Sequence, residues 1–304
     1  MQEREITKQN GNIAFNEEQH IYWDVTAPRE KFVSVTTLIH EFTQPFDKEF
    51  WSAYKALERL LSKDDWAIEK KSLLNTKKFD KVLLELHGIS EDDFNKEQQA
   101  ILDEWDEENR KSCERGTRIH AELENSFYTK KNNIDISKYH IGGKFECVKG
   151  RTELDLENGI YPEYLIYRIS EDRKLRIAGQ IDLLVKKGNK LIIGDYKTNK
   201  KIETKSFFNQ KTKTSAKMKY PLNNLDDVNY YHYCLQLSTY AWMLQKLNPE
   251  FEIEDLVLIH YDHQDNMTVY HLPYLKDEVI RMLNFYKKEH ELIENRNKRK
   301  RIEY

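Results

Sequence analysis

Two aspartates interrupt segments of otherwise apolar sequence. Asp182 stands between Gly-Gln-Ile and Leu-Leu-Val, and Asp195 follows Leu-Ile-Ile-Gly, so each lies in a segment with the composition of a buried strand. A buried carboxylate needs a cation or hydrogen-bond donors to offset its lost solvation. Mg²⁺ takes oxygen ligands of this kind and can activate water for phosphodiester hydrolysis. The pair therefore predicts a metal site, with ordinary turn-proximal acids as the alternative.

Lys197 follows Asp195 by two residues. In a strand, both side chains would point to the same face. The ammonium group could there orient or deprotonate an attacking water, or stabilise negative charge in the transition state. An ordinary surface lysine is the alternative. The sequence Lys-Lys-Gly-Asn at 186–189 predicts a tight turn between the strands of the two acids, which could then converge on one side of a sheet.

The elements that must position these residues form a mixed pattern. Apolar periodicity and turn residues predict a hairpin over residues 11–23, a helix from about Val35 and a helical region over 46–128. The later part predicts, in order, strands over 164–169, 175–185 and 190–196, a helix over 229–247, strands over 256–261 and 267–272, and a helix over 276–293. This order indicates a mixed α/β sandwich rather than a strict alternation of strands and helices.

Composition restricts the class of protein. The chain has 304 residues, of which 33% are charged and 12% aromatic, and its net charge is only -3, which indicates one elaborated globular domain. No apolar run approaches the roughly 18 residues that cross a bilayer, and the start of the chain lacks a secretory segment. We therefore expect a cytoplasmic protein without a membrane partner. The three scattered cysteines, Cys113, Cys147 and Cys234, predict buried free thiols rather than disulfides or a zinc site.

Four short motifs carry a resemblance to a known family. They are GTRIH at 116–120, GQID at 179–182, DYKT at 195–198 and QLSTY at 236–240. In this order they resemble the PD-(D/E)XK nuclease superfamily, and within it the RecB-like branch that includes phage exonucleases and the mitochondrial genome maintenance exonuclease. The resemblance implies a restriction-endonuclease-like α/β fold, in which helices flank a mixed sheet. It divides the chain into an N-terminal hairpin and helical subdomain over 1–115 and a nuclease core over 116–304.

The resemblance also implies roles for individual residues. His120, Asp182 and Asp195 would hold one or two Mg²⁺ or Mn²⁺ ions, the carbonyl of Tyr196 would add a ligand, and Lys197 would position the nucleophile. Glu163 is open between a further metal ligand and a plain strand-edge glutamate.

Gln236 and Tyr240 are four residues apart and share one helix face. By the resemblance they would face the active site and contact the catalytic lysine or the DNA backbone. Simple packing is the alternative for Tyr240.

A lysine-rich insertion over 198–228 follows the catalytic lysine. Eight lysines oppose one acid between Lys197 and Lys219. Lysines can neutralise phosphates and aromatic rings can stack on bases, so we expect a DNA-gripping arm, with a passive insertion as the alternative. The residues that we assign to DNA binding are Lys200, Lys201, Lys205, Lys211, Lys213, Lys217, Lys219, Phe207 and Phe208.

The implied activity is that of a metal-dependent DNA exonuclease or end-processing nuclease. It would act on single- or double-stranded DNA with an end, in phage or bacterial recombination, repair or replication, and in the host cytoplasm if the chain is phage-encoded. Recombination or replication proteins would be its partners. The alternatives are a structure-specific or single-strand endonuclease and, in another class, a non-catalytic nucleic-acid-binding or scaffold protein. Three cysteines cannot supply an iron–sulfur cluster, and no G-x-x-x-x-G-K-[ST] loop for ATP is present.

Overall fold

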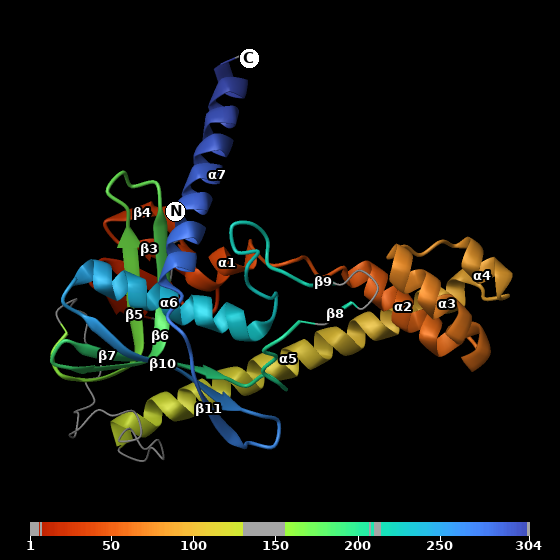
Figure 1. Cartoon of the computed structure of the whole chain (residues 1–304), viewed down its shortest axis with the longest axis horizontal. Coiled ribbons are helices and arrows are strands. Elements are labelled where there is room, and N and C mark those ends of the chain that lie inside the picture. Colours follow the sequence, from red (N-terminus) through yellow and green to blue (C-terminus); the bar gives the residue numbers. More distant parts are fainter. Residues whose placement is uncertain (1–5, 7, 130–155, 207, 210–213, 303–304) are drawn as a thin grey trace. The chain divides into compact units, whose positions relative to one another are not determined.

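The computed structural model of the chain describes residues 6, 8–129, 156–206, 208–209 and 214–302 (Figure 1). The chain divides into two compact units: Met1–Gln44 together with Arg118–Tyr304, and Pro45–Thr117. Among the described residues, no helix combines the length and the apolarity that a membrane crossing requires.

The larger unit is built on a nine-stranded mixed sheet. Its strand order is β1-β2-β3-β4-β6-β7-β10-β11, and β5 pairs with β6 outside this path. The strands are β1 (Lys8–Asn10), β2 (Ile13–Asn16), β3 (Ile21–Asp24), β4 (Ala27–Ser34), β5 (Gly159–Ile169), β6 (Arg176–Lys187), β7 (Lys190–Lys197), β10 (Glu252–Tyr261) and β11 (Met267–His271). A separate hairpin joins β8 (Phe208–Asn209) and β9 (Thr214–Ser215). The sheet confirms the mixed α/β fold that the sequence predicts.

The N-terminal strands belong to the same sheet as the candidate catalytic residues. The predicted hairpin is confirmed, because β2 and β3 pair antiparallel from Ile13 to Asn16. The sequence does not predict β4, whose Val33 and Ser34 pair in parallel with Ile177 and Ala178 of β6. Phe15 and Phe32 are buried on this side of the sheet with Leu165 and Ala178, so a small apolar cluster joins the N-terminal strands to β5 and β6.

Two strands pair with separate parts of one edge of β6 and leave a gap between them. β5 pairs with β6 along one edge, whereas β4 and β7 share the other edge. β4 contacts only residues 177–178 and β7 only residues 183–187. Among the described strands, none pairs with Gly179–Asp182 on that edge. Because no strand occupies this gap, the side chain of Asp182 can accept hydrogen bonds from neighbouring groups.

Helices cover both faces of the sheet. α1 (Val35–His40), α6 (Asn229–Leu247) and α7 (Lys276–Ile302) bury apolar residues with one face, including Leu184 and Ile193. On the other face, Leu123 and Phe127 of α5 (Glu91–Thr129) pack with Leu183, Val185 and Ile192. The alternation of these strand residues sends their side chains to opposite faces.

Local sequence sets the ends of several helices. Ser34 caps α1, since its Oγ accepts a hydrogen bond from the N–H of Thr37 at 3.0 Å. α6 has the predicted bounds, whereas α7 continues to Ile302, beyond the predicted end at 293.

The helical unit has its own apolar core. It contains α2 (Lys48–Leu60), α3 (Lys63–Thr76), α4 (Val82–Leu86) and the N-terminal part of α5, which runs through Gly116 without a break. Ala56, Leu57, Leu84 and Ile101 are almost fully buried within it. Asp47 and Ser62 cap α2 and α3 through hydrogen bonds to main-chain N–H groups. The predicted helical character of this region is confirmed.

Gly179, which lies at the gap along β6, permits close packing of α6. A Cβ atom on Gly179 would lie 2.5 Å from Cε1 of Tyr240, whose side chain is buried. We expect Gly179→Ala to lower the free energy of unfolding by about 1–3 kcal/mol, because the buried ring must move to admit the methyl group. Urea unfolding would measure this. In a Tyr240→Ala background the cost should disappear, and an equal cost in both backgrounds would contradict the explanation.

Candidate active site

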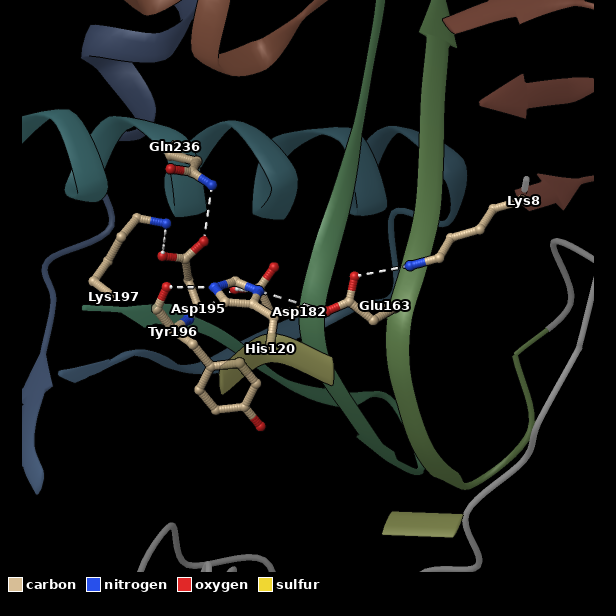
Figure 2. Close-up of polar contacts among 8 residues, drawn as sticks. All are labelled: Lys8, His120, Glu163, Asp182, Asp195, Tyr196, Lys197 and Gln236. Carbon is tan, nitrogen blue, oxygen red and sulfur yellow. Dashed lines mark hydrogen bonds and ion pairs between the residues drawn. The ribbon is translucent and has the colours of Figure 1, made fainter. Parts of the chain in front are cut away.

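Three acids lie in one row across β5, β6 and β7 (Figure 2). Glu163 is opposite Asp182, because Pro162 pairs with Leu183 and Tyr164 with Ile181. Extending the β6–β7 register by one residue beyond Leu183 and Gly194 places Asp182 opposite Asp195. The antiparallel register of β6 and β7 therefore brings the two aspartates together, as we expect from the sequence.

Both aspartates are buried and accept hydrogen bonds from specific donors. Asp182 Oδ2 accepts from the main-chain N–H of Tyr196 at 2.8 Å, and Asp195 Oδ1 accepts from Nε2 of Gln236 at 2.8 Å. Burial raises the pKa of Asp182 and raises that of Asp195 to about 6, although Lys197 opposes the shift at Asp195. Each acid depends on nearby donors and cations to remain ionised.

Lys197 supplies the nearest positive charge. Its Nζ lies 2.5 Å from Oδ2 of Asp195 and 5.1 Å from the ring centroid of Tyr233 on α6. Burial by itself would lower the pKa of Lys197, but the carboxylates of Asp195 and Asp182 hold it above its usual value. The lysine is thus charged, and it is held between an acid and an aromatic ring.

Tyr233 is a residue that sequence reasoning missed. It precedes Gln236 by three positions on α6, so the two side chains share a helix face. Its hydroxyl donates a hydrogen bond to Oδ1 of Asn199 at 2.5 Å. The spacing from Gln236 was the only available signal, and it does not distinguish a lysine contact from ordinary packing.

His120 reaches the row of acids from α5. Its Nε2 donates to the carbonyl of Tyr196 at 3.1 Å, and its Nδ1 lies 3.6 Å from Asp182 Oδ2 and 3.7 Å from Glu163 Oε1. Leu123 and Phe127 follow at helical spacing and pack on the sheet, which fixes this side of α5. Burial lowers the pKa of His120, but the two carboxylates outweigh it and raise the pKa to about 9.

Glu163 has an unusual backbone conformation. Its φ is 52°, in the left-handed region that non-glycine residues rarely adopt. Its Oε2 pairs with Nζ of Lys8 at 3.2 Å, and 8% of its side chain is exposed. Such strain persists where the surrounding structure imposes it, and it occurs often at functional sites. Glu163 therefore lies in a strained conformation beside Lys8 and His120, and its role as a metal ligand stays a prediction.

His120, Glu163 and Asp182 form a group that could hold a metal ion. One ligand atom from each lies within 4.8 Å of the others. Two carboxylates and an imidazole suit a divalent cation. Glu163 Oε1 is buried, and its contact with Nδ1 of His120, at 3.7 Å, is longer than a hydrogen bond, so a cation would satisfy it better. Of the expected ligands, Asp195 lies outside this group beside Lys197, and the Tyr196 carbonyl already accepts from His120.

The two motif residues of α6 occupy different environments. Gln236 contacts Asp195, whereas sequence analysis predicts a contact with Lys197 or DNA. Tyr240 is 3% exposed and lies against Gly179. Burial raises its pKa well above the ordinary value for tyrosine. Tyr240 therefore packs against β6, and its contact with a substrate stays a prediction.

The described lysines of the insertion lie in different settings. Lys217 pairs with Asp226 at 2.6 Å, Lys219 donates to the carbonyl of Glu41 at 3.2 Å, and Lys201 lies 3.6 Å from Glu203. Lys200 and Lys205 are exposed. Phe207, Lys211 and Lys213 lie outside the described residues, and the side chain of Phe208 is not described.

The insertion is anchored to the core of the larger unit. Ile202, Met218, Leu222 and Leu225 are buried in the cluster beneath α6. These four residues therefore pack the two ends of the insertion against the core of the larger unit.

The cysteines differ in burial. Cys234 is a buried free thiol, as predicted, whereas Cys113 is exposed, contrary to the prediction. Cys147 lies outside the described residues.

Comparison with known proteins identifies the family. The sequence profile of the PD-(D/E)XK nuclease superfamily matches residues 37–303. The chain belongs to the PD-(D/E)XK nuclease superfamily. The match covers the α6 motif, the row of acids and the helical unit, so a single family profile spans both the restriction-endonuclease-like core and the helical region. No curated protein is similar enough in sequence to count as a relative.

Two solved structures show distant similarity. One is a protein designated SSO0001, with 20% identity and a TM-score of 0.25, for which the match covers 40% of this chain. The chain spans about half of that protein's length, at 46%. The other comes from Eubacterium rectale and is provisionally described as an exonuclease; it has 11% identity and a TM-score of 0.34, with 92% of this chain and 86% of that chain covered.

The raised pKa of His120 predicts a pH dependence of stability. A histidine whose pKa rises from 6.5 to about 9 on folding stabilises the protein fully below 6.5, and this contribution is lost as pH rises through about 9. In EDTA, the stability advantage of the parent protein over His120→Gln should shrink by on the order of 1–2 kcal/mol over this range, a figure reduced for partial exposure. Urea unfolding at several pH values would measure it. A pH-independent difference would contradict the assignment.

Proposed function

We propose that this chain is a divalent-metal-dependent DNA exonuclease or end-processing nuclease of DNA recombination, repair or replication. The observation that carries the proposal is the row of Glu163, Asp182 and Asp195, with Lys197 held beside Asp195 and His120 beside the other two acids. Membership of a nuclease superfamily directs this arrangement toward phosphodiester hydrolysis.

Each residue of the site has a part in this proposal. A Mg²⁺ or Mn²⁺ ion held by His120, Glu163 and Asp182 would supply the positive charge that acidifies a water and neutralises a phosphate oxygen. The main-chain N–H of Tyr196 fixes Asp182 Oδ2 in position toward that group. The imidazole of His120 is oriented by its Nε2 bond to the Tyr196 carbonyl, so that Nδ1 faces the acids.

Lys197 is the residue that we assign to the reacting phosphate and water. Asp195 and the ring of Tyr233 hold its ammonium group, and Gln236 holds Asp195 through the other carboxylate oxygen. A preorganised ammonium can donate hydrogen bonds to a phosphate oxygen or to the attacking water without reorganising during the reaction.

The choice of DNA with an end rests on the four ordered motifs, which resemble the branch that contains phage exonucleases. The exposed lysines Lys200 and Lys205, which follow Lys197 by three and eight residues, could contact phosphates of a bound strand.

Removing Lys197 or Asp195 should abolish most activity. We expect Lys197→Met and Asp195→Asn each to lower kcat/KM for a linear DNA in Mg²⁺ or Mn²⁺ by about 100-fold or more, because the first removes a preorganised donor and the second removes the carboxylate that holds that donor in place. Lys190→Met is the matched control, since Lys190 lies on the same strand but is half exposed and pairs with Glu254. Loss of an end label would report the rate. Full activity of Asp195→Asn would contradict the assignment.

The topology of the substrate tests the requirement for an end. We expect hydrolysis of linear DNA and no opening of a covalently closed single-stranded circle, because an exonuclease needs a terminus. Gel analysis of both substrates with the same enzyme and metal would show this. Opening of the circle would instead favour the endonuclease alternative, and binding in EDTA without cleavage in any divalent metal would favour a non-catalytic protein.

A further inference from the structure

A second lysine reaches the row of acids from the N-terminal strand. Nζ of Lys8 on β1 lies 3.2 Å from Oε2 of Glu163 on β5 (Figure 2). Two residues later, Nδ2 of Asn10 donates to the carbonyl of Leu165 at 2.7 Å, and Asn10 is 2% exposed. The two contacts are two residues apart on β1 and two residues apart on β5, so the strands run side by side in the same direction. Lys8 is therefore placed by a packed strand rather than by a freely rotating surface position.

Contacts other than this ion pair also hold β1 in place. The buried Asn10 contact already joins β1 to β5, and β1 pairs with β2 through the register that sets Lys8 opposite Phe15. Lys8 also retains contact with solvent, since 24% of its side chain is exposed. A long, partly exposed cationic side chain beside a candidate metal group is suited to an anion from outside.

The carboxylate of Glu163 connects Lys8 with the candidate metal group. Its Oε1 faces Nδ1 of His120, whereas its Oε2 faces Lys8. A cation bound by Oε1 would share the negative charge of Glu163 and so weaken its attraction for the ammonium group. Lys8 would then be available to an incoming anion. Lys197 lies at the Asp195 end of the row and Lys8 at the Glu163 end, so the two ammonium groups flank the candidate metal group.

We propose that Lys8 binds a phosphate of the nucleic-acid strand next to the phosphate at Lys197 and the metal group. This inference rests on the proposed nuclease function and adds a substrate-binding residue to it. The ligand is a phosphate group, and it comes either from the internal backbone or from a phosphorylated 5′ end. Lys8 would hold the strand in register while Lys197 acts at the scissile group.

The test is DNA binding and cleavage by Lys8→Met. We expect a fluorescent linear DNA to bind about tenfold more weakly, in Ca²⁺, and the slope of log K against log salt to fall in magnitude by about one, because one phosphate contact is lost. In Mg²⁺, KM should rise and kcat should change little. Lys8→Arg should retain binding. Lys31→Met is the control, because Lys31 is an exposed lysine on β4 of the same sheet.

Lys8→Gln separates phosphate binding from a structural ion pair. Glutamine can still donate a hydrogen bond to Glu163 but carries no charge, so it should lose the same salt slope as Lys8→Met. A structural role instead predicts parental binding by Lys8→Gln, and this result would overturn the proposal, as would unchanged affinity and slope in Lys8→Met. Thermal unfolding would verify that each variant is folded.

Two further comparisons complete the experiment. The affinity of each variant is measured for the same linear DNA with and without a 5′-phosphate. If Lys8→Met weakens the binding of only the phosphorylated DNA, Lys8 contacts a terminal phosphate. If it weakens the binding of both DNAs, Lys8 contacts an internal phosphate. A parental protein that binds DNA through Lys8 but cleaves neither linear nor circular DNA would contradict the proposed nuclease function while supporting the phosphate contact.

Discussion

The burial of three carboxylates in one row is the constraint on which the rest of this structure depends. Glu163, Asp182 and Asp195 meet at neighbouring positions of three strands, where little of each side chain is exposed. Like charges at this separation raise each other's pKa unless cations and donors compensate. The fold tolerates this row of acids because β4 and β7 leave a gap along one edge of β6, where side chains rather than a strand can approach.

Each neighbouring element contributes at least one compensating group. β7 supplies the ammonium of Lys197 and the N–H of Tyr196, α6 supplies the amide of Gln236, α5 supplies the imidazole of His120, and β1 supplies Lys8. These groups come from segments far apart in the chain, so the site exists only when the sheet and both helical layers have formed. Such a site carries an electrostatic cost in the absence of a cation, and a divalent ion would reduce that cost.

The accuracy of the sequence predictions follows from the range of the interactions involved. β6, β7 and α6 were predictable because turn residues and apolar periodicity are local signals, and α6 has the predicted bounds. β4 was not, because its pairing with β6 joins residues far apart in the chain. For the same reason neither Tyr233 nor Lys8 was assigned to the site. The contact of Gln236 with Asp195, rather than with Lys197, depends on how α6 packs over β7.

The sequence by itself determined the two buried aspartates, the lysine beyond them, the histidine upstream and the family order of their motifs. Residue type, apolar context and spacing along the chain carry this information, because they act within a strand or a helix. Only the tertiary structure decided that Glu163 joins His120 and Asp182 in the candidate metal group, while Asp195 pairs with Lys197. Register and helix packing set those distances, and an electrostatic contact depends on distance in space rather than on separation in sequence.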